Sequence, residues 1–119
     1  MDGNPGGRVD PVAGVDRDGD GRVVVHLVGE LDLYNAHQVR EALLACCDEE
    51  PGRLVVDLAG VEFIDSTALG VLVEARTRMA DRQAFVLAAP GAETQRALEV
   101  SGLDKHFVLR TTVEEALAS

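Results

Sequence analysis

The feature that most constrains this chain is the alternation of short apolar runs with segments whose apolar residues recur at helical spacing. Residues 22–28 are a β-branched run of strand length, and residues 54–58 are a second apolar run of strand length. Segments that begin near residues 36 and 67 follow them and carry apolar residues every three or four positions. Strands joined through such helices become parallel neighbours with right-handed crossovers. The sequence therefore predicts an α/β domain.

The same reasoning, applied to the whole chain, predicts the order β-β-α-β-α-β-α-β-α. A mostly parallel sheet with an N-terminal hairpin strand and about four flanking helices would satisfy this order. The expected strands are residues 9–15, 22–28, 54–58, 85–88 and 107–109, and the expected helices begin near residues 36, 67, 92 and 113. Residues 1–8 are small, polar and rich in chain breakers, so we expect a flexible tail before one domain over residues 9–119.

Local signals predict the ends of several elements. Asn35 and Gln38 have the spacing of a capping box at a helix start. Gly102 suits the left-handed conformation that often ends a helix. Residues 16–21 begin like a calcium loop, but Leu27 occupies the place of the bidentate glutamate and lies in an expected strand. A solvated hairpin turn, which also favours Asp and Gly, is the prediction for residues 16–21.

Charge and composition exclude several classes of function. Eleven basic and 21 acidic residues give a net charge of −10, which disfavours binding to nucleic acid or to an anionic membrane and favours a basic protein partner. No apolar stretch approaches the ~18 residues of a membrane span, and the chain does not begin like a secretory signal. The adjacent Cys46 and Cys47 lack the spacing of a redox pair or a zinc knuckle. We expect reduced cysteines and a cytoplasmic protein.

Enzyme motifs are also missing from the sequence. It contains no Gly-x-Ser-x-Gly nucleophile elbow, no phosphate-binding loop and no dinucleotide fingerprint. His26 lies inside an apolar strand, where a packed role is expected. An enzyme that uses Ser66 or a histidine stays an alternative without a nameable base or oxyanion donors. The prediction is a non-enzymatic protein without a cofactor or a metal.

Polar residues gather where two expected parallel strands end. Asp65, Ser66 and Thr67 form the junction between a strand and a helix, and Glu30 and Asp32 follow the preceding strand. Parallel strands bring such segments to one carboxyl edge, where open α/β sheets usually place their sites. Asp65 or Ser66 could instead serve only as a helix cap, worth about 1 kcal/mol. The local sequence alone does not decide between a helix cap and a functional site.

A family resemblance adds to this pattern. Residues 29–32 (Gly-Glu-Leu-Asp), residues 63–70 (Phe-Ile-Asp-Ser-Thr-Ala-Leu-Gly) and residues 101–103 (Ser-Gly-Leu) resemble the bacterial anti-sigma-factor antagonists of the STAS family. The resemblance covers roughly residues 9–117 and implies the fold predicted above. It also implies partner switching: the unphosphorylated protein binds an anti-sigma factor that is a serine kinase, frees a sigma factor, and is inactivated by phosphorylation. A phosphatase is the expected counterpart of the kinase.

The resemblance assigns roles to particular residues. It implies that Ser66, directly after Asp65, is the phosphoacceptor, and that Glu30, Asp32, Asp65, Ser66 and Thr67 contact the partner. Ala68 stands where many relatives carry glycine, a departure that leaves the acceptor intact. The alternative function is a STAS scaffold subunit of a signalling complex or a lipid-transport assembly, without control of a sigma factor.

Overall fold

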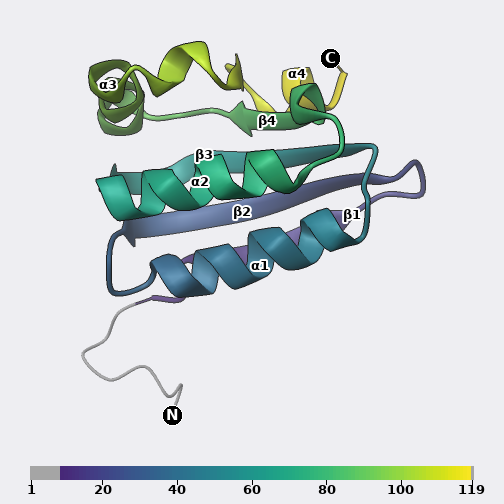
Figure 1. Ribbon diagram of the computed structural model, residues 1–119, viewed down its shortest axis with the longest axis horizontal. Helices are drawn as coiled ribbons and strands as arrows, with labels where there is room; N and C mark the ends of the chain where they lie inside the picture. Colours follow the sequence, from purple (N-terminus) through teal and green to yellow (C-terminus); the bar gives the residue numbers. More distant parts are fainter. Residues whose placement is uncertain (1–8, 119) are drawn as a thin grey trace.

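The computed structural model describes residues 9–118, so the tail predicted at residues 1–8 lies outside the described residues. Five strands form one sheet with the strand order β1-β2-β3-β4-β5 (Figure 1). The elements are β1 (Val12–Arg17), β2 (Arg22–Leu31), α1 (Ala36–Asp48), β3 (Arg53–Ile64), α2 (Ser66–Arg78), β4 (Phe85–Ala88), α3 (Ala92–Ser101), β5 (Val108–Arg110) and α4 (Val113–Ala118), with short 3₁₀ turns at Arg82–Ala84 and Leu103–Lys105.

The strand directions confirm the predicted α/β class. β1 pairs antiparallel with β2, and β2, β3, β4 and β5 are mutually parallel. Each parallel connection contains a helix, as the alternation of patterns requires. The N-terminal hairpin strand, the mostly parallel sheet and the four helices all match the expectation.

Two strands are longer than predicted, and this extension creates the carboxyl edge of the sheet. β2 continues past Gly29 to Leu31, and β3 continues past Leu58 to Ile64. Gly29 has a φ of 80° beside a shift in the β2–β3 register, so the glycine accommodates a bulge and does not end the strand. The first strand begins at Val12, three residues later than expected.

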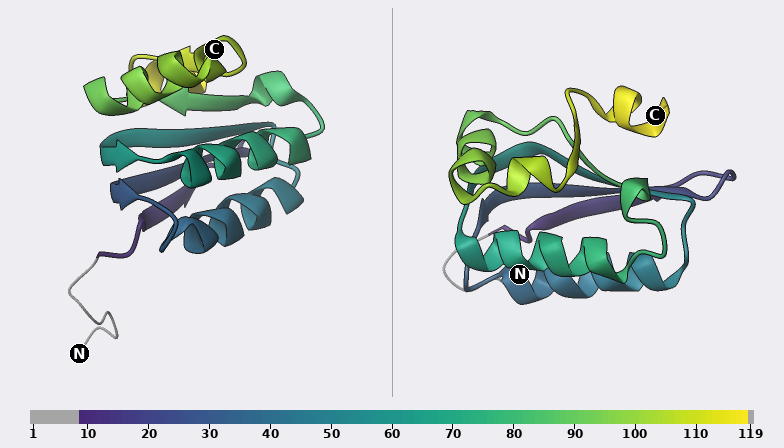
Figure 2. Two further views of the ribbon diagram at one scale, coloured as in Figure 1. Left: turned by 60° about the vertical axis from the view of Figure 1, so that its left-hand side comes forward. Right: turned by 45° about the horizontal axis from the view of Figure 1, so that its top comes forward.

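Three helices (α1, α2 and α3) pack on one face of the sheet, and α4 packs on the other face (Figure 2). Residues of α1, α2 and α3 belong to one large core cluster, whereas Ala116 of α4 packs with strand residues in a separate small cluster. Leu72 lies in the large cluster, whereas the neighbouring Val73 is 37% exposed. No helix within residues 9–118 is long and apolar enough to cross a membrane.

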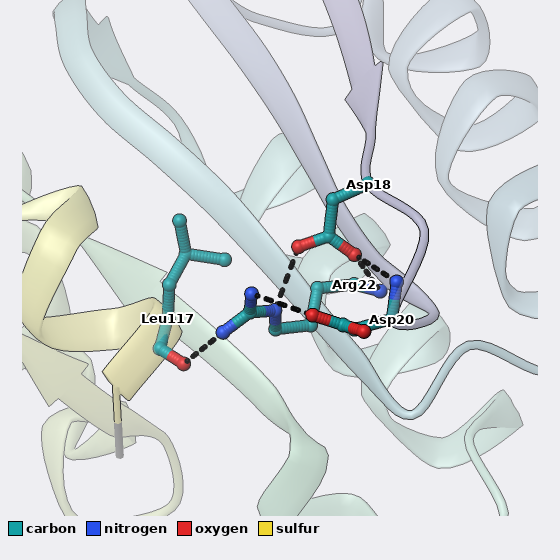
Figure 3. Close-up of polar contacts among 4 residues, drawn as sticks. All are labelled: Asp18, Asp20, Arg22 and Leu117. Atoms are coloured by element: carbon teal, nitrogen blue, oxygen red, sulfur yellow. Dashed lines mark hydrogen bonds and ion pairs between the residues drawn. The ribbon is translucent and has the colours of Figure 1, made fainter.

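The acidic segment before β2 forms a hairpin turn, as predicted (Figure 3). One carboxylate oxygen of Asp18 accepts the backbone N–H groups of Asp20 and Arg22, at 2.9 and 3.0 Å. The Arg22 guanidinium donates to the other Asp18 oxygen at 2.7 Å and to the Leu117 carbonyl at 3.4 Å. These contacts close the turn and connect it to α4.

His26 is not simply packed, which corrects the expectation from its apolar neighbours. Its Nδ1 lies 2.7 Å from Asp57 Oδ2 on β3, and its Nε2 lies 2.7 Å from Asp16 Oδ2 on β1. Carboxylates only accept hydrogen bonds, so both contacts form only when both ring nitrogens carry a proton. The hydrogen bonds to Asp57 and then to Asp16 raise the pKa of His26 above its ordinary value, against the effect of burial.

This bridge predicts a pH-dependent stability. The raised pKa of His26 means that the folded state favours the imidazolium; its stabilisation is fully present below pH ~6.5 and is lost as the pH rises through the folded-state pKa. Urea unfolding of the wild type and of His26→Gln between pH 5.5 and 9 measures the effect. The stability advantage of the wild type should be largest at the acidic end and shrink toward alkaline pH. A constant difference across the range would contradict the bridge.

The adjacent cysteines are free thiols buried in α1. Cys47 donates to the Ala75 carbonyl of α2 with an Sγ–O distance of 3.4 Å. Burial raises the pKa of Cys47 to about 11, so the nucleophilic thiolate is rare at neutral pH. Cys47 therefore contributes to packing between α1 and α2, and Cys46 is a buried residue of the same core cluster.

Candidate functional site

The carboxyl ends of β2 and β3 meet at one corner of the sheet. Leu31 and Ile64, the last residues of the two strands, are register partners. The Asp65 N–H donates to the Leu31 carbonyl at 3.0 Å, which continues the pairing one residue beyond the strands. Asp32 and Asp65 consequently begin two neighbouring connections, as the parallel arrangement predicted.

The Asp65 carboxylate forms hydrogen bonds both to the β2–α1 loop and to the start of α2. Its Oδ1 accepts the Ala68 N–H of α2 at 3.0 Å, and its Oδ2 accepts the Leu33 N–H of the β2–α1 loop at 3.1 Å. Asp65, and not Ser66, is therefore the helix cap that the sequence left open. Ser66 is the first residue of α2 and its side chain is exposed. The cap leaves Ser66 available for another role.

Asn35 fixes the shape of the β2–α1 loop. Its side chain is buried, accepts the Asp32 N–H at 2.9 Å and donates to the Glu30 carbonyl at 2.8 Å. The predicted capping box with Gln38 is therefore wrong, because the Asn35 side chain makes no cap bond to α1. Asp32 Oδ1 accepts the Tyr34 N–H at 3.0 Å, which tightens the loop further.

All five predicted partner-contact residues lie at this corner. Glu30, Ser66 and Thr67 are exposed, whereas Asp32 and Asp65 are partly buried. The carboxylates of Asp32 and Asp65 hold backbone N–H groups, so part of their role is to position the loop and the start of α2. The cap role of Asp65 was one of the predicted alternatives, whereas the loop contact of Asp32 was not predicted.

Three exposed hydrophobic residues at the corner were missed by the sequence analysis. Leu33 is 64% exposed, Tyr34 is 74% exposed and Phe63 is 49% exposed. Leu33 is joined to Asp65 through its backbone N–H, and Phe63 is the register partner of Glu30. The available signal was the Leu-Tyr pair between Asp32 and Asn35, because two large apolar residues are unusual in a short polar connection.

The electrostatic character of the corner is acidic. Residues 23–39 and 54–75, which contain both strand ends and the start of α2, include no Lys or Arg. They supply Glu30, Asp32, Glu62 and Asp65 at the corner itself. An added anion would meet several carboxylates here, and its main local attraction would be the positive end of the α2 dipole.

Comparison with known proteins supports a family assignment. The model of the STAS domain family matches residues 14–116. The anti-sigma-F factor antagonist RsfB of Mycobacterium tuberculosis is 35% identical over 100 residues, which cover 84% of this chain and 82% of RsfB. The anti-sigma-B factor antagonist of Listeria monocytogenes is 37% identical over 89 residues, covering 74% of this chain and 77% of the relative.

A solved structure shows the same architecture. The crystal structure of an anti-sigma factor antagonist from Mycobacterium paratuberculosis superposes with a TM-score of 0.80 at 36% identity, covering 87% of this chain and 88% of that one. The family match spans nearly all of the sheet and its helices. This chain therefore belongs to the STAS domain family.

Proposed function

We propose that this protein is an anti-sigma-factor antagonist controlled by phosphorylation of Ser66. The observation that carries the proposal is the exposed Ser66 side chain at the start of α2, beside an acidic corner, in a chain whose relatives are named anti-sigma factor antagonists. The unphosphorylated protein binds an anti-sigma factor that is a serine kinase and thereby releases a sigma factor. This role places the protein in the cytoplasm.

The modification transfers the γ-phosphoryl group of ATP to Ser66 Oγ. The kinase supplies Mg-ATP and the base that takes the hydroxyl proton, and ADP leaves. A phosphatase hydrolyses the phosphoserine and restores the binding form. This chain contributes only a positioned hydroxyl, so it needs no catalytic residue or cofactor of its own.

The local structure suits Ser66 to this role. The Asp65 cap and the Asp65–Leu33 hydrogen bond fix the backbone on both sides of the site. Leu69 and Leu72, in the next turn of α2, are buried and anchor the helix in the core. A fixed and exposed acceptor lowers the ordering cost when a kinase binds it. Glu30, Asp32, Asp65 and Thr67 complete the proposed contact surface.

Phosphopeptide mapping tests the acceptor. After incubation with ATP and each serine-kinase anti-sigma factor encoded in the same genome, mass spectrometry should find one phosphate, on Ser66. Ser66→Ala should abolish this phosphate, whereas the neighbouring Thr67→Ala should retain it. Phosphate on Thr67 or Ser101 in the wild type would overturn the assignment, as would the absence of phosphorylation by every kinase in the panel.

A further inference from the structure

We infer that Leu33, Tyr34 and Phe63 form an apolar anchor that docks the anti-sigma factor, an inference that rests on the proposed function. The three residues, which we name the corner patch, are 64%, 74% and 49% exposed. Leu33 and Tyr34 lie on the β2–α1 loop and Phe63 lies near the end of β3, two residues before Asp65, which accepts the Leu33 N–H. The patch therefore adjoins Ser66.

The loop that carries the corner patch is held by side-chain hydrogen bonds. Asp65 accepts the Leu33 N–H, Asp32 accepts the Tyr34 N–H, and the buried Asn35 bonds both Asp32 and Glu30. Such a network keeps two large side chains exposed without a flexible loop. Rigid aromatic side chains such as Tyr34 are typical of binding hot spots, and the held loop limits the conformational entropy that Leu33 and Tyr34 lose when a partner covers them.

The negative charge near the corner patch indicates which kind of partner can bind there. Glu30, Asp32, Glu62 and Asp65 lie on the same strand ends and connections as the patch, and residues 23–39 and 54–75 contain no Lys or Arg. A second copy of this chain, with a net charge of −10, would bring carboxylates against carboxylates. A partner with apolar side chains flanked by Lys or Arg matches both the centre and the rim. The occupant is therefore a basic-rimmed apolar surface of the anti-sigma factor.

The test measures affinity for the anti-sigma factor that phosphorylates the wild type. Leu33→Ser and Tyr34→Ser should each weaken binding of the unphosphorylated chain at least tenfold by isothermal titration calorimetry, because truncating a central apolar anchor costs more than 1.4 kcal/mol. Val100→Ser is the matched control: Val100 is 80% exposed near the end of α3, outside the corner. The affinity of Val100→Ser for the anti-sigma factor should equal that of the wild type. Thermal unfolding should show that all three variants are folded.

The outcomes separate this inference from the proposed function. If no anti-sigma factor in the panel binds or phosphorylates the wild type, the proposed function fails. If the wild type binds and is phosphorylated on Ser66, but the Leu33 and Tyr34 variants bind as tightly, only the apolar anchor fails. Sedimentation equilibrium of the chain alone should show a monomer; a dimer that Leu33→Ser abolishes would assign the patch to a second copy and overturn the inference.

Discussion

Phosphorylation of Ser66 should weaken binding to the anti-sigma factor about a thousandfold, which corresponds to about 4 kcal/mol. The phosphate adds about −1.5 to −2 charges at neutral pH. In the free protein, the α2 N-terminus attracts it by typically 0.3–1 kcal/mol, while Asp65 and the other carboxylates of the corner repel it. The fold should therefore change little. At the interface, the basic rim proposed for the partner is already matched to the carboxylates of the corner, so an added phosphate has no Arg or Lys of its own and its dehydration is correspondingly costly.

Calorimetry with the unmodified and the Ser66-phosphorylated chain measures this difference. Ser66→Ala should bind like the unmodified chain and stay insensitive to ATP, whereas Ser66→Asp should bind more weakly. Thr67→Asp is the control for charge alone, because it places a carboxylate one residue away on the same exposed turn; its loss of affinity should be smaller. Equal affinities for the phosphorylated and unmodified chains would contradict the switching mechanism.

The sheet could be predicted from sequence because each buried strand has a pattern that is independent of its neighbours. The run at residues 85–88 is short, apolar and bounded by turn signals, and β4 occupies those residues. The ends of β2 and β3 could not be predicted in the same way. Their extension past Gly29 and Gly60 depends on cross-strand pairing through bulges, which single-strand patterns do not encode.

The place of the site in the fold could be predicted from the sequence, but the hydrogen bonds of its residues could not. Parallel strands had to bring Asp32 and Asp65 to one edge, and they do. The residue order indicated Asp65 as a possible cap of α2, but not its second bond to Leu33, nor that Asn35 would turn back toward Asp32 instead of capping α1. Short polar side chains can satisfy several backbone groups equally well, and tertiary geometry chooses among them.

Truncation of Leu72 should have the largest effect on stability among single substitutions in α2. Leu72 is fully buried in the large core cluster, so Leu72→Ala removes apolar contacts and leaves a cavity, at a cost of about 2–5 kcal/mol. Val73→Ala is the matched control on the same turn, because Val73 is 37% exposed. Its change in the free energy of unfolding should stay within about 0.5 kcal/mol. Urea denaturation monitored by circular dichroism measures both values.

The comparison of Leu72→Ala with Val73→Ala also distinguishes a loss of folding stability from the loss of a contact with a partner. A domain of this size has a stability of about 5–15 kcal/mol, which is at least as large as the expected cost of about 2–5 kcal/mol, so Leu72→Ala should retain a substantial folded fraction at 25 °C. Its folded fraction should still expose Ser66 and accept phosphate, because Leu72 points into the core and the cap at Asp65 stays in place. If Leu72→Ala destabilised the protein no more than Val73→Ala, this result would contradict the packing of α2 against the sheet. It would also contradict the conclusion that this packing holds Ser66 in a fixed position.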